Sequence, residues 1–312
     1  MNTGRHRHHA GEGHVHRAGP DADRRYLRAG LALIGGFVVI EAAVAFTVHS
    51  LALLADAGHM LTDAGALGGA LFVAGLAGRP PSGSWTYGFG RSEILSAAAN
   101  GVSLVAVAVL VLYEAVRRLV HPPAVGGTAV LAVALVGVAV NLAVAWVLSR
   151  ANRASLNVEG AFLHIVTDLY GFVATAAAGL VVMVTGFRRA DPIASLVVVA
   201  LMAKAAWRLL GAAGRVLAQA APDDLDLDEV RRHMLELPHV REVHDLHVWA
   251  LTRELPVITA HVVVEDTCFR DDHAPQILDE LQACLGGHFD VEHSTFQLEA
   301  AGHLDHEPGM HD

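Results

Sequence analysis

The sequence contains few charged residues. Asp, Glu, Lys and Arg make up 17% of its 312 residues, whereas soluble domains contain about 25%, so a large part of this chain must face something other than water. Cysteine is nearly absent, and Cys268 and Cys284 are too few for a disulfide framework or a zinc site built from cysteines. The net charge is −10 and no basic stripe is present, which excludes nucleic-acid binding. The high apolar content excludes disorder.

Apolar residues are abundant instead, at 53%, with a mean hydropathy of +0.42. Six stretches are long enough to cross the core of a lipid bilayer, which takes roughly 20 helical residues. They comprise residues 27–48, 51–77, 92–116, 125–148, 160–184 and 192–217. Connections rich in Pro and Gly separate them. The sequence therefore predicts an integral membrane protein whose all-α membrane domain is a bundle of six transmembrane helices.

Arginine indicates the orientation of these spans. With the N-terminus inside, most arginines of the tail and loops lie on the inner side, and four lie outside: Arg117, Arg118, Arg188 and Arg189. Cytoplasmic loops carry such an excess of positive charge. Because six spans return the chain to its starting side, we expect both termini to be cytoplasmic. The expected location of the protein is the inner (plasma) membrane of a bacterial cell.

The character of the sequence changes after Pro222. The pattern predicts helices over 225–237 and 274–285 and strands over 243–250, 257–265 and 291–298. This order gives a cytoplasmic α+β domain that resembles a ferredoxin-like, metallochaperone-like fold lacking its first strand. The expected division of the chain is a His-rich tail over 1–26, the membrane domain over 27–220, the cytoplasmic domain over 221–300 and a His-containing tail over 301–312.

Histidine is unexpectedly frequent, with 20 residues, and two of these lie inside predicted spans beside aspartates. The second span contains His59 and Asp63, and the fifth contains His164 and Asp168, each pair in the pattern His-x-x-Thr-Asp. A spacing of four places each pair on one helical face. The second and fifth of six spans run antiparallel, so the repeated pattern indicates an inverted three-helix repeat with a site between its halves.

Two imidazoles and two carboxylates form a four-ligand set that suits Zn²⁺. The same ligands accept Cd²⁺ and Co²⁺, so the choice among these metals stays open. Asp56 lies on the same face as Asp63 and is a candidate for tuning the site or carrying a proton. The alternative is that the polar pairs only join helices through hydrogen bonds. Ionisable side chains are costly inside a bilayer, and packing does not require the same pattern twice.

Transport is the function that this set favours. A catalytic zinc needs an open position for water, and no His-Glu-x-x-His motif is present, so we predict that the protein is not an enzyme. Metal binding needs neutral histidine and ionised aspartate, so protons compete with the metal for the same atoms. The hypothesis is export of zinc from the cytoplasm in exchange for protons. The alternative is a membrane-anchored zinc sensor whose intramembrane site is structural.

The chain resembles the cation diffusion facilitator family. The resemblance rests on the six spans, the paired His-x-x-x-Asp, the stretch from Ser50 to His59 and the C-terminal domain, and it covers residues from about 27 to 299. The combination of His and Asp in the paired motif is similar to that of the zinc-preferring branch of the family. The resemblance implies a homodimer, alternating access and export of divalent metal by antiport with protons.

The resemblance also implies particular metal ligands. His59, Asp63, His164 and Asp168 match the family's transport site. In the cytoplasmic domain, the residues that match the family's zinc ligands are His244, His261, His293 and Glu299. His247 and His273 are further candidates. The alternative for each of these histidines is simple exposure on a polar sheet.

Two features depart from the family or fall outside its pattern. The loop over 84–91 contains no metal ligand, so we expect the additional zinc site of some members to be absent. The N-terminal tail contains five histidines, His6, His8, His9, His14 and His16. Such a tract is typical of a metal-gathering segment, and a leader without a role is the alternative.

Overall fold

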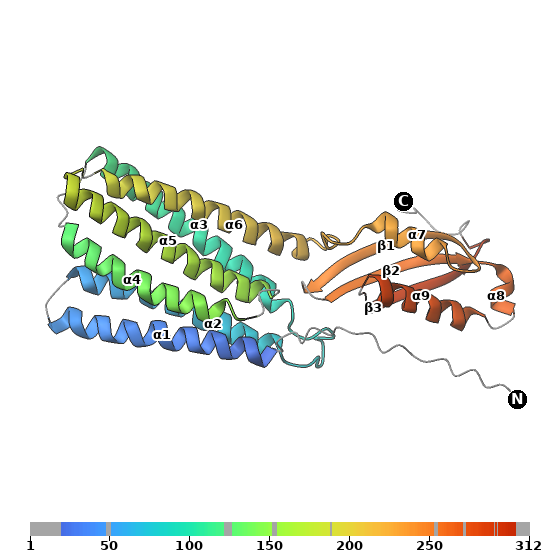
Figure 1. The fold of residues 1–312 in the computed structure, drawn as a ribbon. Coiled ribbons are helices and arrows are strands. Elements are labelled where there is room, and N and C mark those ends of the chain that lie inside the picture. Colours follow the sequence, from blue (N-terminus) through green and yellow to red (C-terminus); the bar gives the residue numbers. More distant parts are fainter. Residues whose placement is uncertain are drawn as a thin grey trace, which may run out of the picture.

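The computed structural model describes residues 20–47, 51–121, 127–151, 155–187, 189–252, 255–270, 273–289, 291 and 293–303. Within these ranges the side chains at 20–23, 44–47, 51–59, 62, 127–130 and 133 are not described. A bundle of long helices comes first along the chain, and a smaller part with a three-stranded sheet follows it (Figure 1).

The described bundle consists of α1 (Pro20–Thr47), α2 (Leu51–Ala77), α3 (Ser92–Val120), α4 (Gly127–Leu148), α5 (Leu156–Thr185) and α6 (Ala190–Leu217). Each predicted apolar stretch coincides with one of these helices. Four helices, α1, α3, α5 and α6, contain segments long and apolar enough to cross a membrane, and the described apolar segments of α2 and α4 are shorter. The protein is thus an integral membrane protein, and the count of six spans stays a prediction.

Large apolar side chains cover the outer surface of the bundle. Phe72, Leu110, Tyr113 and Val184 are between 67 and 72% exposed. Burying such side chains away from water is worth about 1.5–3 kcal/mol each, so their exposure is favourable where lipid surrounds them. The end of α5 is sharply defined: Gly186 adopts the left-handed region at φ 69°, and its N–H donates to the Val182 carbonyl. Glycine enters that region without steric cost.

Helix α5 lies at the centre of the bundle, in contact with α2, α3, α4 and α6. One apolar core joins α1, α2, α4 and α5 through residues such as Leu27, Met60, Val144 and Ile165. A second core joins α3 to α6, where Leu104 packs near Met202. This arrangement brings α2 and α5, the two helices that carry the repeated His-x-x-Thr-Asp, against each other.

The C-terminal part consists of α7 (Leu227–Leu235), β1 (Val240–Thr252), β2 (Leu255–Val264), α8 (Asp266–Arg270), α9 (Ala274–His288) and β3 (His293–Ala300). The predicted order of helix, strand, strand, helix and strand is present, with the short α8 as an addition. Strands β1 and β2 form an antiparallel pair, and β3 lies parallel to β2 after the α8–α9 crossover. This is a small sheet with α7 and α9 packed on one face, and its assignment as ferredoxin-like stays a prediction.

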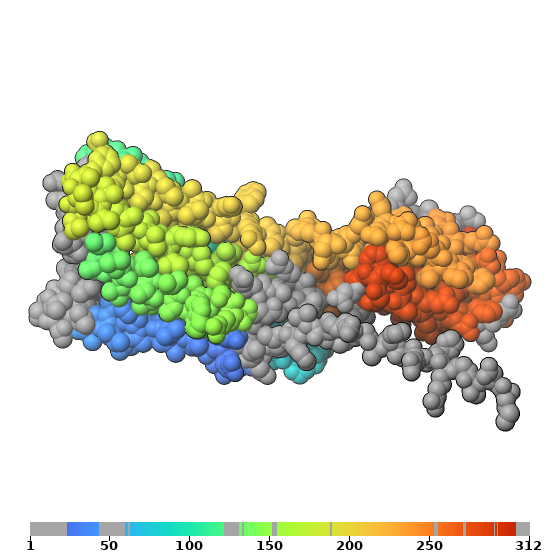
Figure 2. All heavy atoms as spheres, viewed as in Figure 1, coloured from blue at the N-terminus to red at the C-terminus, as the bar shows by residue number. Residues whose placement is uncertain are grey.

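The two faces of the sheet differ. Ile258, Ala260 and Val262 of β2 belong to a core that includes Met234 of α7 and Leu281 of α9. Because side chains alternate along a strand, His261 points to the opposite face. The base of the bundle meets β1 where Ala250 joins the apolar cluster of α3, α5 and α6, and the two parts form one elongated particle (Figure 2).

Candidate metal centres

Three of the four predicted transport ligands meet inside the bundle. Nε2 of His164 lies 3.2 Å from Oδ1 of Asp63 and 3.6 Å from Oδ2 of Asp168. One ligand atom from each residue lies within 4.8 Å of the others. Asp63 is 1% exposed and His164 is 7% exposed, so the cluster is almost entirely buried. Spacing of four on α5 places His164 and Asp168 on one face, and the contact with α2 supplies Asp63.

The fourth predicted ligand, His59, belongs to α2 and precedes Asp63 by one helical turn. Its side chain and that of Asp56 lie outside the described residues, so their roles stay predictions. A ligand at His59 would complete a set of two nitrogens and two carboxylates, which is a tetrahedral set for zinc.

A cavity of about 220 Å³ lies beside this cluster. It is formed between α3, α5 and α6, and Thr167, Asp168, Phe172 and Ser195 are among its lining residues. Asp168 therefore belongs both to the buried cluster and to the cavity wall. Of the three residues of the cluster, Asp168 is the one that lines this cavity.

A buried asparagine fixes the helices around the site. Asn157 of α5 donates through Nδ2 to the Ala70 carbonyl of α2 at 2.7 Å, and its Oδ1 accepts from the Ser96 hydroxyl of α3 at 2.7 Å. One side chain thus connects three helices. Because buried polar atoms are costly without partners, these bonds hold α2 and α5 in one register.

A second cluster lies on the sheet, on the face opposite α7 and α9. His244 of β1 is the cross-strand partner of His261 of β2. Oε1 of Glu299 lies 2.7 Å from Nδ1 of His261, and Oε2 lies 3.6 Å from Nε2 of His244. One extra residue of β1 between His244 and His247 forms a bulge, at which Asp245 has a φ of 46°. Three of the six predicted cytoplasmic ligands are thus adjacent.

The other three predicted cytoplasmic ligands are not among the three residues whose ligand atoms lie within 4.8 Å of one another. His247 pairs with Thr259 and is exposed. His293 pairs with Val257, about 13 Å along β2 from His261. His273 stacks on the ring of His239, with 6.2 Å between centroids. The histidines of the N-terminal tail, from His6 to His16, lie outside the described residues.

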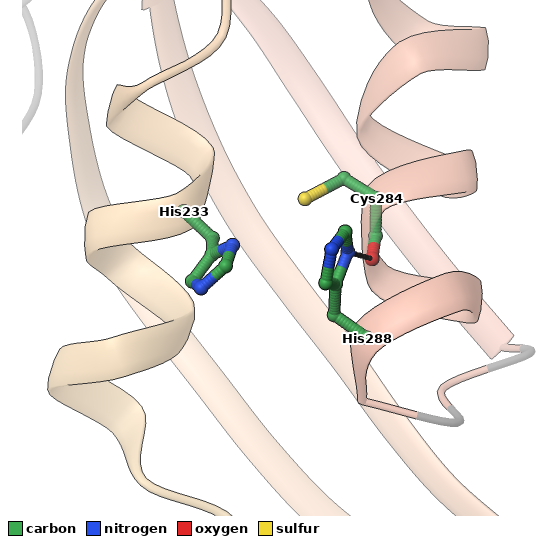
Figure 3. Close-up of side chains that lie close together, drawn as sticks. All are labelled: His233, Cys284 and His288. Atoms are coloured by element: carbon green, nitrogen blue, oxygen red, sulfur yellow. Dashed lines mark hydrogen bonds between the residues drawn. The ribbon is translucent and has the colours of Figure 1, made fainter.

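The sequence reasoning missed a third cluster, formed by His233, Cys284 and His288 (Figure 3). The low number of cysteines excluded a zinc site made of cysteines alone, but it did not exclude a site that combines one cysteine with histidines. The available signal was the Cys-x-x-x-His spacing of Cys284 and His288, but the predicted helix ended three residues before His288. The contribution of His233 depends on how α7 packs on α9.

A membrane bundle with a buried His/Asp cluster, followed by a sheet that carries a His/His/Glu cluster, is the arrangement expected of a metal-cation transporter. The chain belongs to the cation diffusion facilitator family: the cation efflux transmembrane domain matches residues 27–218, and the cation efflux protein cytoplasmic domain matches residues 222–301. This confirms the resemblance stated from the sequence. Members of the family are transporters and not enzymes, and the activity that the family and the relatives support is divalent-metal efflux.

Individual relatives carry more specific names. The metal cation efflux system protein CzcD of Cupriavidus metallidurans is 39% identical over 292 residues, which cover 94% of this chain and 90% of that protein. The zinc transporter ZitB of Escherichia coli is 40% identical over 281 residues, covering 89% and 88%. The cadmium, cobalt and zinc/H(+)-K(+) antiporter of Bacillus subtilis is 33% identical over 293 residues, covering 93% of each.

Among solved structures, the chain is similar to the metal-bound C-terminal domain of the CzcD transporter from the same Cupriavidus species. It is 39% identical, and the match covers 24% of this chain and 99% of that chain, with a TM-score of 0.22.

Proposed function

We propose that this protein exports Zn²⁺ from the cytoplasm in exchange for protons, through a site formed by His59, Asp63, His164 and Asp168. The observation that carries the proposal is the meeting of Asp63, His164 and Asp168 within 4.8 Å in the interior of a membrane bundle. A set of imidazole and carboxylate favours zinc over magnesium and calcium, which prefer oxygen alone. The names of ZitB and the Bacillus antiporter, which include zinc, support this choice, and the name of CzcD supports metal-cation efflux.

The position of His164 supports proton exchange. Its Nε2 lies between two carboxylates. Ionised carboxylates only accept hydrogen bonds, so at 3.2 Å the Nε2–H donates to Oδ1 of Asp63. A metal ion would bind the same Nε2 through its lone pair. The proton must therefore leave this atom before the metal binds, and a proton that returns there displaces the metal.

The proposal includes the topology. Six spans, with both termini cytoplasmic in a bacterial inner membrane, agree with the arginine distribution. Antiparallel α2 and α5 with matching His-x-x-Thr-Asp segments suit an inverted repeat around a site that opens alternately to the two sides. We further propose the division of the chain at residues 220 and 221, a homodimer formed through the ferredoxin-like cytoplasmic domain, and zinc binding by His244, His261 and Glu299.

The test is zinc flux into proteoliposomes under an imposed pH gradient. Wild-type protein should transport zinc at a rate that follows the gradient and should move protons in the opposite direction. His59→Ala and Asp168→Ala should both lose flux. Transport that ignores the gradient would refute the exchange, and equal flux in all three proteins would refute the site. A protein without flux whose cytoplasmic domain still responds to zinc would indicate the sensor function instead.

A further inference from the structure

The cluster of His233, Cys284 and His288 lies between two helices on the face of the sheet opposite the His244 cluster. His233 comes from α7, and Cys284 and His288 come from α9 (Figure 3). One nitrogen or sulfur atom from each residue lies within 4.8 Å of the others. The proposed transport ligands lie in the helical bundle, and the His244 cluster lies on the other face of the sheet. Neither proposed site therefore includes these three residues.

Local structure explains why the three side chains converge. A spacing of four places Cys284 and His288 on the same side of α9. Neighbouring Leu281 and Leu285 are fully buried in the core, as are Val230 and Met234 of α7. The packing of these apolar residues fixes α7 beside α9. The packing of the two helices therefore holds the three ligand atoms together.

Hydrogen bonding orients the ring of His288. Its Nδ1 lies 3.0 Å from the backbone carbonyl oxygen of Cys284. Because a carbonyl only accepts, Nδ1 carries the proton and Nε2 keeps its lone pair. Metal-bound histidines in proteins usually donate their second ring nitrogen to a carbonyl or carboxylate in this way. The ring of His233 stands edge-on to Phe289, with centroids 5.3 Å apart, and lies 5.0 Å from the ring of His288.

The surroundings favour a cation. The carboxylate of Glu236 lies near the Cys284 thiol. Oε1 of Glu229 lies 3.9 Å from Nε2 of His233. Arg232 binds both of these glutamates and balances part of their charge. A divalent cation would offset the remaining negative charge and that of a thiolate at Cys284.

We propose that His233, Cys284 and His288 form a binding site for one Zn²⁺ ion per chain, with a fourth position open to water. Two imidazole nitrogens and one thiolate form a borderline-soft set that selects zinc against magnesium, calcium and manganese. The bound ion would connect α7 to α9. Since α7 follows directly after the last membrane helix, this site would tie the start of the cytoplasmic domain to its core.

Cobalt provides a test that is specific to sulfur. Tetrahedral Co²⁺ bound to a thiolate absorbs in the near ultraviolet, and neither Asp63–His164–Asp168 nor His244–His261–Glu299 contains sulfur. Titration of the full-length protein in detergent with Co²⁺ should give this band, at one ion per chain. Cys284→Ser should abolish the band. Cys268→Ser is the matched control, because Cys268 is 2% exposed within the apolar core and should leave the band intact.

The same titration separates this site from the transport function. Asp168→Ala should keep the cobalt band even though it is expected to lose zinc flux. A band that is absent from wild-type protein, or that persists in Cys284→Ser, overturns the proposal whether or not the protein transports zinc. His233→Ala and His288→Ala should each weaken cobalt binding, and unchanged affinity in both would also overturn it.

A measurement on unmodified protein avoids any effect of substitution on folding. Zinc bound at Cys284 should slow alkylation of this thiol by N-ethylmaleimide, read by mass spectrometry of the Cys284 peptide. With free zinc at 100 times its dissociation constant, the rate should fall about 100-fold. Magnesium at the same concentration should leave the rate unchanged. Equal rates with and without zinc would contradict binding at Cys284.

Discussion

The contact between α4 and α5 is tight enough to predict the effect of adding one methyl group. A Cβ atom built on Gly137 of α4 would lie 2.3 Å from two ring carbons of Phe172 in α5. Non-bonded carbon atoms rest about 3.5–4.0 Å apart, so the ring would have to move by roughly 1.2 Å or more. Phe172 lies one turn after Asp168 and lines the cavity beside it. The contact therefore holds the helix that carries the proposed transport ligands.

Two opposing effects set the magnitude for Gly137→Ala. Alanine is favoured over glycine within a helix by about 1 kcal/mol. Forcing extra atoms into a packed core costs about 1–3 kcal/mol. The substitution should therefore be neutral or destabilising by up to about 2 kcal/mol in the wild-type protein. With the ring removed by Phe172→Ala, the same substitution should stabilise by about 1 kcal/mol, because only the helix term remains.

The assay is a double-mutant cycle on unfolding in mixed detergent micelles, followed by circular dichroism. The coupling between positions 137 and 172 should be about 1–3 kcal/mol, equal to the packing cost. Gly171→Ala in α5 is the matched control, since a Cβ atom there meets nothing within 4 Å. A Gly137→Ala effect that is equal with and without the Phe172 ring would show that the two helices do not approach this closely.

Three further predictions concern charge and hydrogen bonding. Asp168→Asn removes one unit of charge that lies no more than about 2.8 Å from the centre of its cluster. Even at the dielectric constant of water, a divalent ion at that centre loses about 3 kcal/mol of Coulomb attraction. The half-saturating zinc concentration for flux should therefore rise at least about 100-fold, and the control Asp191→Asn should leave it unchanged. A hydrogen bond from His239 and a nearby guanidinium hold the pKa of Glu265 below its ordinary value of 4.5. Glu265 therefore stabilises the folded state above pH 4.5, and this effect is lost as the pH falls through the lower pKa of the folded state. The difference in denaturant midpoint between wild type and Glu265→Gln should accordingly shrink with acidification. Asn157→Ala removes two interhelical hydrogen bonds and should lower the free energy of unfolding by about 1–2 kcal/mol, measured in the same micelles.

The long elements could be predicted from the sequence because their signal is local. Six apolar stretches gave the positions of α1 to α6, since lipid requires continuous apolar helices with internally satisfied backbones. The pairing of Asp63 with His164 was also predictable, although the residues are 101 positions apart. An ionisable residue within a span is costly enough to require a partner, and the repeated His-x-x-Thr-Asp identified which partner.

The arrangement of the cytoplasmic histidines was less predictable because it depends on register. His244 and His261 meet through antiparallel pairing, and Glu299 joins them only because β3 lies parallel to β2 in one register. A shift of one residue would turn Glu299 to the other face of the sheet. The sequence contains no signal for this register, so His247 and His293 were equally reasonable candidates before the sheet was known.

The donor atoms of the three clusters are suited to different residence times for a metal. A transport site must release its ion in every cycle, and protons compete with a metal for the nitrogen and oxygen donors of Asp63, His164 and Asp168. A thiolate at Cys284, in the site proposed between α7 and α9, would hold zinc more tightly than a carboxylate does. Sulfur in the transport cluster would slow turnover, whereas sulfur between α7 and α9 would keep an ion in place across transport cycles. The test compares the zinc concentration that half-saturates flux with the zinc concentration that displaces cobalt from Cys284 and removes its absorption band. If the sulfur site fills at the lower concentration, the two sites have these separate roles. Filling in the reverse order would contradict this assignment.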